Sequence, residues 1–211
     1  MAMGRPKEHN DHTATALLDA AERIVEREGM PALSVRRVAN DVGASTRAVY
    51  SLFGAKEGLV SALGARAFDL LGEMVSALPS TDDPAADVIQ AGLTFCRFAL
   101  EHPALFQIGV QRTEVDTQTA RSFSGSADRA LVALRERLGR LQDAGLMGDR
   151  TLETATWEFH ALCEGLSSMD ARCGYRGTEA ERLWVDALSA LVNGWAASAT
   201  SGTLLRTSHS H

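Results

Sequence analysis

SVRRVANDVGASTRAVYSLFGAK, residues 34–56, is the stretch that decides the fold. It predicts two short helices around a glycine turn. The first helix carries apolar residues at i, i+3, i+4 and i+7, which form one buried face: Val35, Val38, Ala39 and Val42. Gly43 follows where the chain must turn, because glycine enters the left-handed region without steric cost. The stretch therefore predicts a helix-turn-helix, and DNA is the expected partner.

The second helix is expected to begin after Ser45, whose hydroxyl can cap the free backbone amides of the first turn. Val49 and Phe53 continue the apolar face. The remaining polar residues point away from it and form an outward set: Thr46, Arg47, Tyr50 and Ser51. Arg47 can pair with guanine or clamp a phosphate, and Thr46 can contact a thymine methyl group or a backbone oxygen.

Further residues of this stretch are candidates for phosphate contacts. Tyr50 and Lys56 suit phosphates, because a phenol hydroxyl and an ammonium group fix the register on DNA without reading its sequence. Arg36 is a phosphate contact or a simple surface charge, and for Arg37 the surface charge is favoured. The predicted DNA-binding set is Arg36, Ser45, Thr46, Arg47, Tyr50, Ser51 and Lys56.

The chain resembles the tetracycline-repressor (TetR) family of bacterial regulators over a longer span. The resemblance begins with ALLDAAERIVEREG at residues 16–29, continues through LSVRRVANDVGAS, and ends with TRAVYSLFGAKEGL near Leu59. Two positions depart from the family pattern: Ala14 stands where an arginine is usual, and Ser51 where an aromatic residue or histidine is common. Thr13 or the basic arm residues Arg5 and Lys7 are possible substitutes for that arginine. Arg5 is a candidate for the minor groove, and a disordered end is the alternative.

The charge of the chain is unevenly distributed. Its 211 residues carry a formal net charge of −6, yet the charges up to Gly58 balance and residues 34–56 alone carry +3. The acidic remainder is expected to repel DNA and orient the protein on it. Three cysteines without a CxxC pair, no signal peptide and no membrane-length apolar run indicate reduced thiols and a cytoplasmic protein.

The rest of the chain predicts an all-α fold with about nine helices, since apolar residues recur at helical spacing and no strand alternation is present. A helix-turn-helix domain is expected at 1–58, with a flexible arm at 1–12. A ligand-binding and dimerisation domain should follow at 59–200, and a flexible tail at 201–211. The helices expected in the second domain cover 56–78, 84–102, 127–145, 151–171 and 178–199, with a short element at 104–110 and a loop or broken helix at 113–126.

The last two helices are expected to form a dimer interface. The final helix is apolar over much of its circumference and needs neighbours on two sides, which a second subunit or the rest of one monomer would supply. The resemblance implies that these helices pair with their copies in a homodimer. Two reading helices about 34–36 Å apart would then bind a pseudo-palindromic double-stranded operator. The resemblance also implies a repressor released by a small molecule.

An apolar or amphipathic effector is expected among the middle helices, where aromatic residues supply apolar walls. The candidate ligand-binding residues are Phe98, Phe106, Met147, Trp157 and His160. His160 either orients a polar group of the ligand or is a buried histidine bonded to backbone, with Glu164 at i+4 as a candidate partner.

Other classes of function have weaker support in the sequence. A metal- or redox-responsive regulator would use His160, Cys163 and Cys173. A ligand-binding dimer without DNA affinity is suggested only by Ala14 and Ser51. No GxSxG, HExxH, P-loop or dinucleotide motif is present, so no enzyme, catalytic residue, cofactor or metal ligand is predicted.

Overall fold

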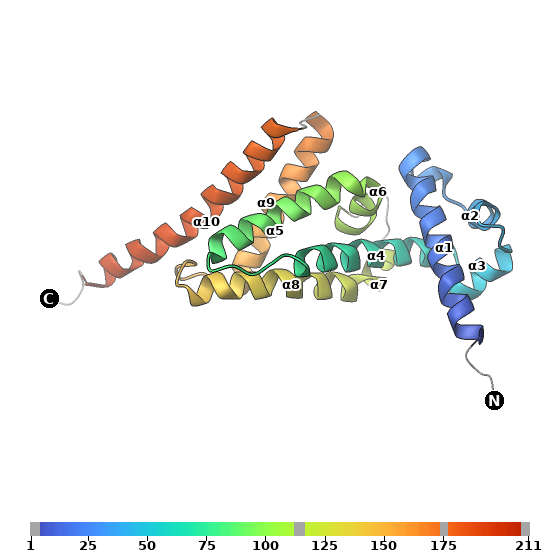
Figure 1. Cartoon of the computed structure of the whole chain (residues 1–211), viewed down its shortest axis with the longest axis horizontal. Coiled ribbons are helices and arrows are strands. Elements are labelled where there is room, and N and C mark those ends of the chain that lie inside the picture. The colour runs from blue at the N-terminus through green and yellow to red at the C-terminus, as the bar shows by residue number, and fades with distance from the viewer. Residues whose placement is uncertain (1–4, 112–116, 174–176, 208–211) are drawn as a thin grey trace. The chain divides into compact units, whose positions relative to one another are not determined.

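The structure is all-α, as predicted. The computed structural model describes residues 5–111, 117–173 and 177–207, and within its helices it leaves out the side chains of residues 5–9, 120 and 198–207. These described residues contain ten α-helices and no strand (Figure 1). The elements are α1 (Arg5–Glu28), η1 (Met30–Ala32), α2 (Val35–Asp41), α3 (Thr46–Phe53), α4 (Lys56–Ser76), α5 (Pro84–Glu101), α6 (Pro103–Leu105), the π-helical turn η2 (Phe106–Val110), α7 (Thr117–Ser122), α8 (Ser124–Asp143), α9 (Leu152–Cys173) and α10 (Thr178–Thr207).

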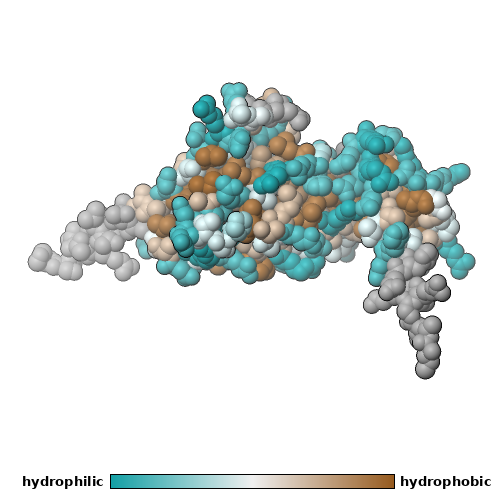
Figure 2. Space-filling model, viewed as in Figure 1, coloured by the Kyte–Doolittle hydropathy of each residue, from teal (hydrophilic) through white to brown (hydrophobic). Residues whose placement is uncertain are grey.

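The chain divides into two compact units. The first unit contains Met1–Asp69 and His102–Ala127, and the second contains Leu70–Glu101 and Asp128–His211. The first unit includes most of α4, so the domain boundary expected at residue 58 falls inside this unit. Side chains over the helices of the first unit are mostly hydrophilic, whereas hydrophobic side chains gather over helices of the second unit (Figure 2).

The first unit is built on α1, which contacts α2, α3 and η1. Its buried face repeats at helical spacing and consists of Leu17, Ala20, Ala21, Ile24 and Val25. Val38 and Ala39 of α2 and Val49 of α3 complete this core. Ala39 is fully buried, in agreement with the small residue expected near the helix crossing. The core holds α2 and α3 as a pair on α1.

A second contact region of the first unit lies between α4, η2 and Phe123, which joins α7 to α8. A Cβ atom on Gly64 would lie 2.6 Å from the Phe123 ring, and one on Gly109 would lie 2.6 Å from the Cβ of Ala67. The rings of Phe68 and Phe123 pack with centroids 6.1 Å apart. Small residues thus let these helices approach closely around one buried aromatic pair.

The second unit packs α5, α9 and α10 against one another. Leu188 of α10 lies over Gly92 of α5, where a Cβ would approach it to 2.5 Å. The indole N–H of Trp184 donates to Asp170 at 2.7 Å, and that of Trp195 donates to Glu158 at 2.6 Å. Both tryptophans of α10 are therefore buried with satisfied polar atoms, as buried indoles require.

Two arginines of α8 fix the end of α4 and the connection to α5. Arg137 donates to the carbonyls of Val75, Leu78 and Pro79 at 2.9, 2.6 and 3.2 Å, and it satisfies acceptors that a helix end leaves free. Arg140 pairs with buried Asp87. These contacts are local to the second unit and hold the α4–α5 connection against α8.

The helix boundaries agree with the predicted ones to within a few residues along most of the chain. The differences lie elsewhere: residues 5–12, expected as a flexible arm, belong to α1, and α10 runs to Thr207 into the expected tail. Part of the expected loop at 113–126 is helical, as α7 and the first turn of α8. Residues 1–4, 112–116 and 208–211 lie outside the described residues. No described helix is both long and apolar enough to cross a membrane.

Candidate nucleic-acid interface

Serine caps begin both helices of the helix-turn-helix. The Ser34 hydroxyl accepts from the N–H of Arg37 at 3.3 Å at the start of α2. The Ser45 hydroxyl accepts from the N–H of Ala48 at 3.1 Å at the start of α3, which is the predicted cap. Each cap satisfies one amide of a first turn and fixes where the helix begins. The Ser45 oxygen accepts one bond from the helix, and its O–H remains free to donate to another group.

Glycines redirect the backbone on either side of α3. Gly43 has φ +68° in the turn after α2, and Gly54 has φ +76° at the end of α3. Such angles favour glycine, because a Cβ is strained there. Gly58 has a different role: a Cβ on it would lie 1.8 Å from the carbonyl oxygen of Phe53. The first turn of α4 therefore packs directly on the last turn of α3, which positions Lys56 beside it.

The outward residues of α3 form one exposed face, which we call the reading surface: Thr46, Arg47, Tyr50 and Ser51. Tyr50 is 55% exposed, although it is a large side chain next to the core residue Val49. A burial pattern that repeats within a single short helix leaves these four side chains on the solvent side. The structure therefore brings together all the α3 side chains that the sequence predicts as DNA contacts.

Ion pairs neutralise most of the other described cations of the first unit. Arg37 forms a bidentate pair with Glu28, and Arg23 pairs with Asp41 at 2.8 Å. The hydrogen bonds from Arg37 are the largest cause that lowers the pKa of Glu28, and they raise the pKa of Arg37 in turn. Both pairs join α1 or its end to α2 through exposed side chains. Their contribution to stability is small, but they consume positive charge.

Three cations around α3 are left without such a partner. Among the described side chains, Arg36, Arg47 and Lys56 have no ion pair or hydrogen bond to the protein, and Arg36 and Arg47 are exposed. An unpaired guanidinium can donate its hydrogen bonds to a phosphate or to a base edge without first breaking an ion pair within the protein. Arg36 therefore has no ion pair to break before it contacts another molecule, whereas its neighbour Arg37 does. The side chains of Arg5 and Lys7 lie outside the described residues.

Sequence reasoning missed the acidic residues that decide which arginines of the first unit are paired and which are not. Glu28 and Asp41 leave no local signal, because each meets its arginine only when α1 packs on α2. Gly58 was also missed, although glycine inside a helix is unfavourable and therefore a detectable sign of close packing. The Ser34 cap had the same signal as Ser45, a serine directly before an apolar-periodic stretch.

The predicted ligand-binding residues occupy different environments. Phe98, Met147 and Phe106 are buried, and Phe106 belongs to the first unit whereas the others belong to the second. His160 packs edge-on against Phe95 with ring centroids 5.8 Å apart, and its Nε2 lies 3.7 Å from Glu164. The predicted partner Glu164 is therefore in place. Trp157, the remaining ligand-binding candidate, is 53% exposed.

The cysteines do not have the surroundings expected of a metal or redox centre. Burial raises the pKa of the Cys96 thiol to about 11 and is the largest cause of the raised pKa of Cys163. A protonated thiol is a poor metal ligand and a poor nucleophile. Cys173 is exposed at the end of α9. The described residues therefore give no support to a centre at His160, Cys163 and Cys173.

Family models match both parts of the chain. Residues 17–63 match the model described as bacterial regulatory proteins, tetR family. Residues 88–192 match the model described as tetracyclin repressor-like, C-terminal domain. The chain belongs to the TetR family of bacterial transcriptional regulators. The resemblance seen in the sequence is thereby confirmed, and the family and fold indicate a DNA-binding regulator rather than an enzyme.

Individual relatives agree with this assignment. The chain is 36% identical over 72 residues to the HTH-type nicotine-responsive transcriptional repressor HdnoR of Paenarthrobacter nicotinovorans, a match covering 34% of this chain and 36% of that protein. A protein of unknown function from Rhodococcus sp. RHA1 superposes with a TM-score of 0.76 at 20% identity, covering 87% of this chain and 95% of the other. The fatty acid degradation regulator FadR of Bacillus halodurans superposes with a TM-score of 0.72 at 16% identity, covering 90% and 97%. At these identities the solved structures establish the fold.

Proposed function

We propose that this TetR-family regulator is a homodimeric repressor that binds a pseudo-palindromic operator through the reading surface and is released by a small effector. The observation that carries the proposal is the selective availability of charge around α3. Arg36, Arg47 and Lys56 are unpaired, whereas Arg23 and Arg37 are neutralised. This distribution concentrates positive charge next to the polar face of α3, where phosphates and base edges would lie.

The roles within the reading surface follow from side-chain chemistry. Arg47 reads a guanine through paired N–H donors or clamps a phosphate, and Thr46 contacts a neighbouring base or backbone oxygen. Tyr50 donates its phenol hydrogen to a phosphate, with Lys56 and Arg36 as further phosphate contacts. Ser45 and Ser51 complete the surface with hydroxyl donors. Repression, as distinct from activation, is supported by the name of HdnoR, whose match covers about a third of its length.

Dimerisation through α9 and α10 is supported by their exposed faces. On α9, apolar or small residues are exposed at every fourth position: Trp157, Ala161, Gly165 and Met169. On α10, Ala190, Gly194 and Ala197 are exposed on one side. We call these faces the α9 stripe and the α10 stripe.

The glycines of the two stripes have no explanation within the described part of one subunit. A Cβ on Gly165 or Gly194 would meet no atom within 4 Å. Glycine inside a helix costs about 1 kcal/mol relative to alanine. Close approach of a helix from a second subunit would account for both positions, and a two-fold axis would bring the same stripes together. We therefore assign exposed Trp157 to this interface.

The second unit is the proposed location of the effector. His160, Phe98 and Met147 remain candidates there, although a ligand has to displace packed side chains to reach the two buried residues. A groove of about 650 Å³ lies between α5 and the first turn of α10 and combines apolar Leu93 and Leu100 with charged Arg97 and Glu181. An amphipathic compound fits this mixture of surfaces, as small-molecule sites usually combine apolar walls with few polar groups.

The test is a gel shift of the purified chain on DNA from upstream of its own gene. Arg47→Ala should weaken specific binding about 5- to 150-fold, the equivalent of about 1–3 kcal/mol for one base-reading arginine. Tyr50→Phe should weaken binding less and equally on all sequences. Arg135→Ala, which removes a half-exposed arginine of α8 in the second unit, is the matched control and should bind like the parent chain.

Salt and folding measurements separate the possible outcomes. Affinity should fall steeply with salt, and the slope should decrease by about one for each phosphate contact removed. Circular dichroism should show that both variants stay folded. Full affinity in both Arg47→Ala and Tyr50→Phe would refute the assignment of the reading surface. A parent chain that binds no DNA would instead favour a dimer without DNA affinity.

A further inference from the structure

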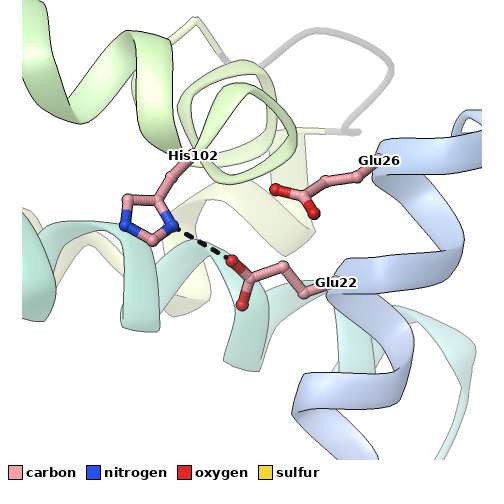
Figure 3. Close-up of side chains that lie close together, drawn as sticks. All are labelled: Glu22, Glu26 and His102. Atoms are coloured by element: carbon pink, nitrogen blue, oxygen red, sulfur yellow. Dashed lines mark hydrogen bonds and ion pairs between the residues drawn. The ribbon is translucent and has the colours of Figure 1, made fainter.

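Three potential metal ligands converge within the first unit, away from the reading surface. Glu22 and Glu26 lie one turn apart on α1, and His102 precedes α6, which packs against α1. One ligand atom of each residue lies within 4.8 Å of the other two. Figure 3 shows the three side chains pointing toward a common space from two separate segments of the chain.

The distance between the two inner ligands suits a metal ion. Nδ1 of His102 lies 3.3 Å from Oε1 of Glu22. Two ligand atoms each about 2.0–2.1 Å from a zinc ion at a tetrahedral angle lie about 3.4 Å apart. The pair therefore has the spacing of two ligands on one ion. Glu26 is exposed, so its side chain can rotate by the small amount needed to provide a third ligand.

The charge of this region also favours a cation. Asp19, Glu22 and Glu26 share one face of α1, and the cation that meets this face is Arg66, which lies 2.5 Å from Asp19 and 3.4 Å from Glu22. Arg66 binds the Oε2 atom of Glu22, so Oε1 stays on the side of His102. A hydrogen-bonded second oxygen is the usual way in which a protein orients a carboxylate ligand.

An ordinary ion pair between Glu22 and His102 would not explain the position of Glu26. It has no hydrogen bond or ion pair among the described residues, yet it lies one turn from Glu22 and faces the same imidazole. Like charges at i and i+4 destabilise a helix by a few tenths of a kcal/mol. A bound cation between them would convert this repulsion into attraction.

We propose that Glu22, Glu26 and His102 bind a divalent transition-metal ion of the zinc type. The mixed nitrogen and oxygen ligand set suits zinc or cobalt, whereas calcium and magnesium prefer oxygen ligands alone. Water would complete the coordination, since Glu26 leaves the site open to solvent. The ion would join α1 to the segment at His102 and stabilise the first unit, whether or not the chain binds DNA.

The test is a titration of the purified, metal-free 211-residue chain with cobalt and zinc ions. Calorimetry and the visible absorption of bound cobalt should report one saturable site. Glu26→Gln removes a ligand but preserves the contacts of Glu22 with His102 and Arg66, and it should lower zinc affinity more than tenfold. His102→Gln should do the same. Glu57→Gln, at an exposed position of α4, is the matched control and should leave affinity unchanged.

Other histidines require a separate comparison. His9, His12, His209 and His211 lie near the chain ends and can bind metal weakly, but they are present in every variant and so provide a constant background. Zinc should raise the melting temperature of the parent chain and of Glu57→Gln, and it should do so less in Glu26→Gln. Equal zinc affinity and equal stabilisation in the parent and Glu26→Gln would overturn the proposal and leave an ordinary Glu22–His102 ion pair. The absence of saturable cobalt binding would overturn it as well.

Discussion

At Gly58 the chain has no room for a side chain, because the first turn of α4 lies directly on the end of α3. A Cβ there would lie 1.8 Å from the carbonyl oxygen of Phe53, and this neighbour is backbone rather than a flexible side chain. The geometry of the reading surface relative to Lys56 therefore depends on a residue that would contact no DNA. A side chain at this position would have to change the angle between the two helices.

Gly58→Ala should destabilise the protein by about 1–3 kcal/mol, the usual cost of overpacking, and should weaken operator binding. Denaturant unfolding and a gel shift measure the two effects. Gly139→Ala on α8 is the matched control, since a Cβ there meets no atom within 4 Å. It should stabilise the chain by up to about 1 kcal/mol through helix propensity. A tolerated Gly58→Ala would show that the two helices can separate freely.

Single residues also show how far sequence could predict the interface. Ser45, Gly43 and the exposed set from Thr46 to Ser51 follow from local rules of capping, turn geometry and helical period. The pairing of Arg37 with Glu28 does not, because it needs the packing of α1 against α2. From sequence, Arg36 and Arg37 are two adjacent arginines of one short helix, and only tertiary structure separates an available cation from a neutralised one.

At the scale of elements, the connection between α4 and α5 depends on two side chains of α8. Burial opposes ionisation of Asp87, but hydrogen bonds from Thr81 and Arg140 together outweigh it and lower the pKa of the carboxyl. Arg137 meanwhile holds three carbonyls at and after the end of α4. Helical period alone places Arg137 and Arg140 on or beside the solvent side of α8 and cannot reveal a loop folded over them.

Asp87→Asn should reduce stability at neutral pH by about 2 kcal/mol, since it weakens charge-assisted hydrogen bonds to a buried group. A carboxyl whose folded pKa lies below its unfolded value stabilises the protein above the unfolded pKa. That contribution disappears as the pH falls through the folded pKa. The stability difference between the parent and Asp87→Asn should therefore shrink below about pH 4. A difference independent of pH would contradict this role of the charge.

Arg137→Ala should cost about 2–3 kcal/mol, because carbonyls at the end of α4 lose their donor. Arg135→Ala, on the same helix but half-exposed, should change stability by less than about 0.5 kcal/mol. Thermal unfolding of the two variants under one set of conditions gives the comparison. Equal melting temperatures would mean that water replaces Arg137 at these carbonyls.

At the scale of the whole molecule, charge and apolar surface are separated along the chain. Residues 34–56 carry a local positive charge in a chain with a net charge of −6, while the proposed subunit contacts lie on α9 and α10. Sequence predicted both the all-α fold and the family, because helical periodicity and the helix-turn-helix spacing persist over long spans. It could not show that the first unit includes segments from residues 102–127, since that grouping arises from contacts distant in sequence.

Gly165→Leu and Gly194→Leu should each shift the protein from dimer to monomer, because a large side chain would prevent close approach of the two stripes. Light scattering after gel filtration measures the mass, and operator affinity should fall with it. Gly139→Leu is the matched control on a helix outside the stripes and should leave the mass unchanged. A dimeric mass in both stripe variants would move the interface elsewhere.

The bidentate pair between Arg37 and Glu28 has a consequence for how the regulator searches a genome. A carboxylate at the end of α1 keeps one guanidinium from adding to the attraction that every phosphate exerts, whatever the sequence. Loss of that carboxylate would strengthen binding to every site, and because incorrect sites far outnumber the correct one, more protein molecules would be held away from it. An acid that contacts no nucleotide would thus set the number of protein molecules a cell needs to keep a single promoter occupied.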